Sequence, residues 1–160
     1  RGMAGGYTLT PPVEDKHYWS KKDLDAKMAV ALGGRVSEEL FIGEVTTGAE
    51  NDLEMVTHLA RKMVCEFGMS PRLGNMTLGR RHGPLFLGRD IVEERDYSED
   101  TAKVIDEEVR VIVNKAYEKA RSILEQNRDK LNLLAQTLLE KEVLDVSEVR
   151  NLLGLPANPA

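Results

Sequence analysis

The sequence predicts a mostly helical α+β domain with a small β element of two or three strands. The first observation is that apolar residues recur three and four positions apart over several long segments, which is the pattern of a helix with one buried face. The second is that three short apolar runs, at residues 7–10, 76–78 and 85–87, lie near glycine or proline, as short strands do. The order of strand, two helices, hairpin and further helices is that of an α+β domain.

The first helix is predicted to run for about 20 residues from Ser20 to near Gly43. Ser20 is a suitable N-cap, and Asp23 follows it three residues later. Gly33 and Gly34 lie at the middle of this helix. A glycine in a helix interior costs about 1 kcal/mol relative to alanine, so the pair predicts that another group approaches the backbone closely.

The second helix is predicted to begin at Thr47, where Glu50 completes a capping box, and to end at Gly68. The two apolar runs that follow it form the predicted hairpin, and the run near the start of the chain would supply a third strand.

Three more helices are predicted in the second half of the chain. Ser98 caps the longest of them, and the next extends over about residues 128–140. Asp145 and Glu148 form a capping box for a short last helix. Residues 156–160 are expected to be a frayed tail.

Composition limits the classes of function. The 160 residues carry a net charge of −5, which argues against nucleic-acid binding by the chain as a whole. No apolar run approaches the 18 residues of a membrane-spanning helix, so we expect these residues to be soluble. The lone Cys65 excludes an intramolecular disulfide and is expected to pack in the core. Neither a Gly-x-Ser-x-Gly motif nor a glycine-rich phosphate loop occurs, so we do not expect these residues to bind ATP.

The segment from Thr46 to Leu53, Thr-Thr-Gly-Ala-Glu-Asn-Asp-Leu, places a carboxylate, Asp52, about one turn into the second helix. A carboxylate there stabilises the helix N-terminus by about 0.3–1 kcal/mol, which is sufficient reason for its presence. A carboxylate on a rigid helix is also a suitable zinc ligand, because catalytic zinc takes three protein ligands and leaves a fourth position for water. From the residues alone, the structural role is favoured.

This segment follows Leu32-Gly33-Gly34-Arg35-Val36-Ser37-Glu38-Glu39 at short range. The two segments together resemble the carboxy-terminal part of the zinc-peptidase domain of FtsH-type membrane-anchored AAA+ proteases. Further segments are similar to that family in the same order, and the resemblance extends from residue 1 to about residue 153. They are residues 67–70, 86–89, 105–109, 117–120 and 138–142.

The resemblance implies that Asp52 is the third zinc ligand, and that residues 1–155 are the carboxy-terminal part of the peptidase domain with 156–160 as a tail. Glu38 is the better candidate for a carboxylate that orients a zinc-bound histidine, although a solvated acid or a salt bridge with Arg35 is equally consistent. The family's His-Glu-x-x-His motif, which holds the other two ligands and the catalytic glutamate, does not occur in these 160 residues. We therefore assign no catalytic residue here and expect the fragment alone to be inactive.

The resemblance also implies what the intact protein does. It implies an ATP-dependent zinc metalloendopeptidase that degrades unneeded or damaged membrane and cytosolic proteins as unfolded substrates. It further implies a homo-hexamer, an AAA+ module that binds ATP and Mg, and upstream segments that anchor the protein at the cytoplasmic face of the bacterial plasma membrane. The alternative is a non-enzymatic helical adaptor or oligomerisation module that uses the apolar stripe from Ala102 to Ile123.

Overall fold

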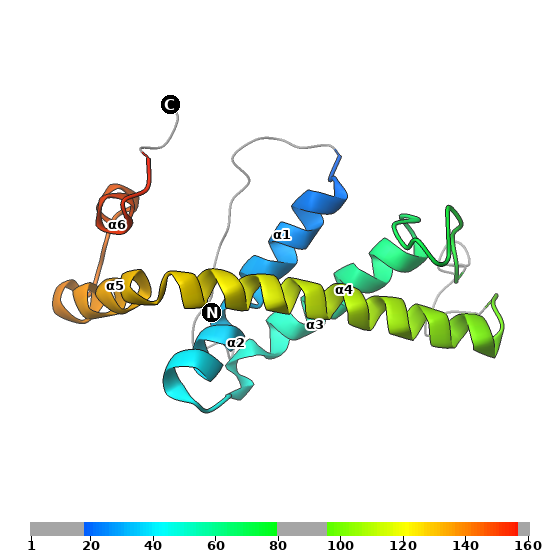
Figure 1. Cartoon of the computed structure of the whole chain (residues 1–160), viewed down its shortest axis with the longest axis horizontal. Helices are drawn as coiled ribbons and strands as arrows, with labels where there is room; N and C mark the ends of the chain where they lie inside the picture. The colour runs from blue at the N-terminus through cyan, green and yellow to red at the C-terminus, as the bar shows by residue number, and fades with distance from the viewer. Residues whose placement is uncertain (1–17, 80–95, 157–160) are drawn as a thin grey trace, which may run out of the picture.

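The computed structural model describes residues 18–79 and 96–156, and every regular element in these two ranges is a helix (Figure 1). The elements are α1 (Lys21–Ala31), α2 (Gly33–Ser37), the π-helix η1 (Glu38–Ile42), the 3₁₀ helix η2 (Thr47–Ala49), α3 (Glu50–Cys65), α4 (Glu99–Gln126), α5 (Arg128–Lys141) and α6 (Val146–Leu153). The first three α-helices pack against α4, while α5 and α6 pair with each other beyond its end. None of these described helices is both long enough and apolar enough to cross a membrane.

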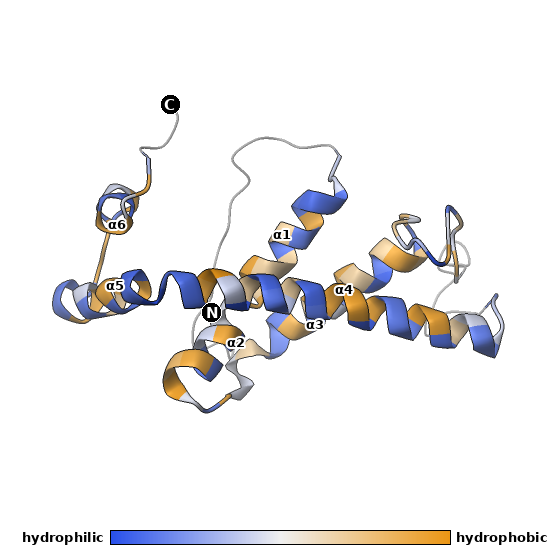
Figure 2. Cartoon of the chain, in the orientation of Figure 1, coloured by the Kyte–Doolittle hydropathy of each residue, from blue (hydrophilic) through white to orange (hydrophobic). Residues whose placement is uncertain are grey.

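The core lies where α1, α2 and α3 meet one face of α4. Burying a side chain of valine, isoleucine or methionine stabilises a fold by about 1.5–3 kcal/mol. Figure 2 shows apolar and polar residues mixed along the length of α4, as expected for a helix with one buried face. All four helices contribute side chains with no solvent exposure, among them Met28, Val36, Val56, Met63 and Ile105.

The apolar stripe of α4 is used within the chain. Ile105, Ile112, Ala116 and Ala120 are buried in the core, and only Ile123 at the end of the stripe is half exposed. The adaptor hypothesis required this stripe as a surface for a partner. Because the stripe packs against the chain's own helices, that hypothesis loses the surface on which it depended.

The first predicted helix is confirmed at both ends, although it consists of three consecutive pieces. Ser20 forms the capping box with Asp23, and Gly43 ends η1 in the left-handed conformation with φ of 80°. A Cβ atom on Gly33 or Gly34 would meet nothing within 4 Å among the described residues. The close approach predicted at this glycine pair is therefore not found within the part of the chain that the structure covers.

The second predicted helix begins differently from the prediction. Thr46, not Thr47, supplies the cap: its hydroxyl accepts a hydrogen bond from the Gly48 N–H at 3.2 Å and opens η2. The α-helix starts only at Glu50, without a side-chain cap. The predicted capping box between Thr47 and Glu50 is wrong, because the preceding threonine satisfies the free N–H of the turn.

The predicted β element does not form among the described residues. Residues 76–78 have no regular secondary structure. The Leu78 N–H donates instead to the carbonyl of Cys65, the last residue of α3, at 2.8 Å. This segment thus closes the end of a helix rather than pairing with a strand. The other two predicted strands, at 7–10 and 85–87, lie outside the described residues.

The three helices predicted after the hairpin are confirmed. Ser98 caps α4 by accepting from the Thr101 N–H at 3.2 Å. The helix predicted over about 128–140 is α5, and Asp145 and Glu148 form the capping box of α6.

Candidate functional site

Asp52 lies in the first turn of α3, and the start of this helix lies near α2 in Figure 1. Its side chain is exposed to solvent. Within the described ranges, its carboxylate accepts no hydrogen bond and forms no ion pair. An acidic side chain in the first turn of a helix suits the direction of the helix dipole, and the Asp52 oxygens are available to a ligand.

The turn that precedes Asp52 is held by Glu38 of η1. One oxygen of the Glu38 carboxylate accepts the Thr46 backbone N–H at 3.0 Å, and the other accepts the Thr46 hydroxyl at 2.6 Å. These two hydrogen bonds favour the charged carboxylate, so the Thr46 hydroxyl first and its backbone N–H second lower the pKa of Glu38 below its usual value. A Cβ atom on Gly48 would come within 3.3 Å of the Thr46 hydroxyl, so a glycine leaves room for this arrangement.

The same turn is held from its carbonyl side by Arg35 of α2. The Arg35 guanidinium donates to the Thr46 carbonyl at 3.3 Å and to the Glu39 carboxylate, one helical turn away, at 3.2 Å. Glu39 in turn accepts a hydrogen bond from the Tyr117 hydroxyl on α4. This bond to a carboxylate favours the protonated phenol and raises the pKa of Tyr117.

A further contact fixes η1 to the long helices. Arg128, the first residue of α5, donates to the Leu40 carbonyl at 3.1 Å and lies over the Phe41 ring, 4.9 Å from its centroid. Such a cation–π contact is worth about 0.5–1 kcal/mol at an exposed site. Short π-helical segments occur often at functional sites. Here the π-helix carries both carboxylates, Glu38 and Glu39, that organise the approach to α3.

The structure therefore places the two predicted site residues in different situations. Asp52 is exposed with its oxygens available, whereas both oxygens of Glu38 accept hydrogen bonds from Thr46. Arg35 pairs with Glu39 rather than with Glu38. Sequence reasoning missed the roles of Glu39 and Tyr117. The four-residue spacing of Arg35 and Glu39 was a usable signal for their pair, but no local signal links Glu39 to a tyrosine 78 residues later.

The chemistry of Asp52 fits one position of a zinc site. Zinc accepts a carboxylate oxygen at about 2.0–2.2 Å, and a catalytic zinc site has three protein ligands. Among the described residues, no group of three or more histidine, cysteine, aspartate and glutamate side chains is arranged to hold a metal ion. The described part of the chain thus supplies one candidate ligand, on a rigid mount, and not a complete site.

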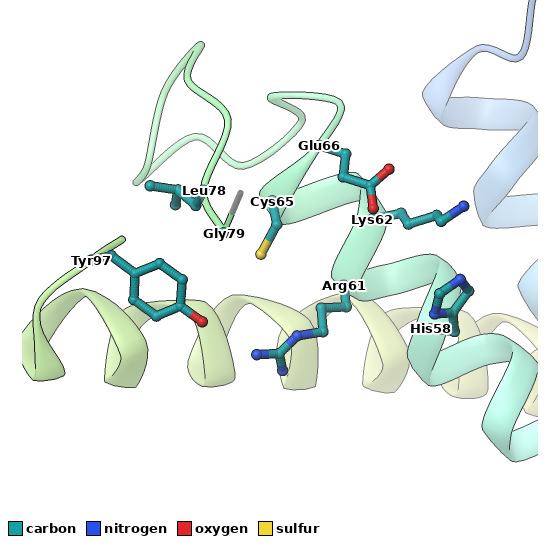
Figure 3. Close-up of a pocket in the computed structure, with 8 residues that line it drawn as sticks. All are labelled: His58, Arg61, Lys62, Cys65, Glu66, Leu78, Gly79 and Tyr97. Carbon is teal, nitrogen blue, oxygen red and sulfur yellow. The ribbon is translucent and has the colours of Figure 1, made fainter. Parts of the chain in front are cut away.

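A separate pocket lies at the other end of α3 and has a volume of about 250 Å³ (Figure 3). Arg61 and Cys65 lie on the side of α3 toward Tyr97, whereas Lys62 extends away from it. The pocket begins more than a turn beyond Asp52, and Cys65 lies about 20 Å farther along the helix axis. It is therefore not part of the Asp52 site. Its lining residues are His58, Arg61, Lys62, Cys65, Glu66, Leu78, Gly79 and Tyr97.

Comparison with known proteins gives a consistent result. Residues 1–152 match the model of peptidase family M41. The chain is 50% identical over 156 residues to the ATP-dependent zinc metalloprotease FtsH 1 of Thermomicrobium roseum, covering 98% of this chain and 24% of that protein. It is 51% identical over 159 residues to FtsH 3 of Synechocystis (96% and 26%) and 48% identical over 154 residues to FtsH of Bacillus subtilis (96% and 24%). The chain thus spans about a quarter of the length of the curated relatives it matches.

Proposed function

The chain belongs to peptidase family M41, and from this premise we propose that it is part of an ATP-dependent zinc metalloendopeptidase of the FtsH type. Residues 1–155 would be the carboxy-terminal part of the peptidase domain, and residues 156–160 a tail. The support is a match over nearly all of this chain to proteins named for that activity, each about four times as long.

The observation that carries the proposal at the level of residues is the exposed Asp52 carboxylate at the start of α3. Asp52 would bind the zinc ion as its third protein ligand, and the other two would come from residues outside these 160. When bound, zinc polarises a scissile carbonyl and lowers the pKa of a bound water. Because α3 is packed into the core through Val56 and Ala60, the backbone that carries Asp52 is already ordered before zinc binds.

Glu38 would act in the same site in two ways. Its two hydrogen bonds hold the turn at Thr46. A carboxylate has about four acceptor positions, so two remain for other donors. One of these would accept the ring N–H of a zinc-bound histidine and fix the orientation of that ring, as carboxylates commonly do around metals.

The rest of the proposal concerns the intact protein. It would be a membrane-anchored homo-hexamer whose peptidase domain lies at the cytoplasmic face of the membrane. An AAA+ module, distinct from this chain, would bind ATP and Mg. It would deliver damaged or unneeded membrane and cytosolic proteins, as unfolded substrates, to the peptidase domain. These 160 residues alone would not hydrolyse peptides, because they offer one of three zinc ligands.

The test is Asp52→Ala in the full-length protein. We expect casein cleavage to fall by at least about 100-fold while ATP hydrolysis persists, because the substitution removes a zinc ligand and leaves the nucleotide site untouched. The matched control is Glu54→Ala, which removes an exposed carboxylate two residues later on the same helix and should leave cleavage unchanged. Retained casein cleavage in the Asp52→Ala protein would refute the ligand assignment.

A further inference from the structure

The start of α3 is connected to α4 by a continuous series of polar contacts. Tyr117 of α4 donates to Glu39, Glu39 accepts from Arg35, and Arg35 donates to the carbonyl of Thr46. We propose that Tyr117 is a positioning residue for Asp52, although it lies on a different helix. This inference rests on the proposed function, because it assigns to Tyr117 a part in holding the zinc ligand.

The first step is the contact between the two helices. Tyr117 packs against the core and is partly buried, so its ring has a fixed place on α4. Its hydroxyl donates to one oxygen of Glu39, and the other oxygen accepts from Arg35. The side chains of Arg35 and Glu39 are only 26% and 31% exposed, so water competes less for these bonds than at an open surface.

The second step is the turn itself. Arg35 holds the carbonyl of Thr46, while Glu38 holds both its N–H and its hydroxyl. The Thr46 hydroxyl also accepts from the Gly48 N–H. Every polar group of Thr46 therefore has a partner. The conformation of this turn depends on the placement of Arg35, and thus on the Glu39 carboxylate that Tyr117 orients.

The third step is the effect on Asp52. The turn leads through η2 directly into the first turn of α3, with Ala49 buried at the junction. A metal ligand has to stay within a few tenths of an ångström of its productive position, so small movements of this junction weaken zinc binding without unfolding the domain. Tyr117 thus acts on Asp52 through geometry and touches neither zinc nor substrate.

The first experiment measures amide hydrogen exchange at Thr46 and Gly48 in the 160-residue chain. Tyr117→Phe removes only the hydroxyl, and we expect exchange at both amides to become about three- to tenfold faster, the range for the net contribution of one typical hydrogen bond. The matched control is Tyr97→Phe near the other end of α4, which should leave both rates unchanged. Unchanged rates in Tyr117→Phe, or equal acceleration in the control, would overturn the inference.

The second experiment measures zinc affinity by chelator competition, together with peptidase kinetics, in the full-length protein. Tyr117→Phe should weaken zinc binding by about three- to tenfold, as for the loss of one typical hydrogen bond, and lower kcat at unchanged KM. Glu39→Gln, which keeps an oxygen acceptor for the phenol, should retain more affinity than Glu39→Ala. Faster exchange in the chain with unchanged zinc affinity would show a purely structural contact and would also overturn the inference. If instead Asp52→Ala leaves cleavage intact, the proposed function fails, and that result is separate from these readouts.

Discussion

The body formed by α1 to α4 and the hairpin of α5 and α6 have similar amphipathic sequences, yet only the body buries side chains. The buried residues of the described ranges all lie between Leu24 and Ala120, and α5 and α6 contain none. Leu139 and Val143 are 84% and 77% exposed. A leucine-rich helical pattern therefore indicates which face would be buried, but burial occurs only where another element covers that face.

The polar contacts of the two regions differ in the same way. In the body they join distant residues: Ser70 donates to Glu108, 38 positions away, at 2.7 Å. Between residues of the hairpin they are local, and the longest in sequence is the 2.9 Å bond from Lys141 to Glu148, seven positions away. Arg128, at the start of α5, joins the hairpin to the body through its bond to the Leu40 carbonyl. The body is thus organised by tertiary contacts, whereas the hairpin is organised by caps and neighbouring charges.

The largest expected difference between the regions is in apolar packing. Ile105→Ala, at a site with no exposure, should lower the free energy of unfolding by about 2–5 kcal/mol, because it removes buried carbons and leaves a cavity. Leu139→Ala on the hairpin should change it by less than about 0.5 kcal/mol. Urea unfolding of both variants, followed by circular dichroism, measures this. Equal losses in the free energy of unfolding would show that the hairpin is covered in solution and that the two regions do not differ in apolar packing.

The next difference is in polar contacts. Ser70→Ala should lower the free energy of unfolding by about 1.5–3 kcal/mol, because Glu108 is 8% exposed and would lose a hydrogen bond to its charged carboxylate. Lys141→Ala should cost clearly less than Ser70→Ala, since both members of its pair are exposed and water screens their attraction. The same urea experiment compares them. A Ser70→Ala cost no larger than that of Lys141→Ala would mean that Glu108 finds another partner, such as Arg72 at 3.8 Å.

The same division explains which predictions from the sequence succeeded. The caps at Ser20, Ser98 and Asp145 are local, since each depends on residues within three positions, and each was predicted correctly. The cap of the second helix was misplaced by one threonine, because Thr46 is fixed by Glu38, eight positions earlier. A strand at 76–78 was predicted from its apolar residues, but strand formation requires a partner, and the backbone of this segment bonds to the end of α3 instead.

The candidate site divides in the same manner. The place of Asp52 on the helix was predictable, because helical spacing and the resemblance both fix it in the first turn. The support around it was not predictable from local pattern. Tyr117 and Glu39 are 78 positions apart, and the contact of Arg128 with Leu40 spans 88 positions. Such contacts follow from how the helices cross α4, which no single stretch of sequence contains.

The smallest expected effect concerns two glutamates, one in each region, whose pKa is lowered for different reasons. Glu38 and Glu148 both have a lowered pKa, so each stabilises the folded chain fully above the usual glutamate pKa of about 4.3 and less as the pH falls through the lowered value. For Glu38 the main cause is hydrogen bonding from Thr46, whereas for Glu148 it is the side chain of Lys141. Salt screens the attraction between two exposed charges far more than it weakens hydrogen bonds from neutral donors to a carboxylate. Raising salt should therefore move the titration midpoint of Glu148 toward its usual value and move that of Glu38 less, because the charge of Arg35 contributes less to its lowered pKa than the Thr46 hydrogen bonds do. NMR shifts of the two side-chain carboxyl carbons, followed between about pH 2 and pH 6 at low and high salt, measure both midpoints, and Glu38→Gln assigns the first. Equal salt sensitivity would show that charge, rather than the Thr46 turn, determines the pKa of Glu38, and the contrast between the body and the hairpin would not extend to their carboxylates.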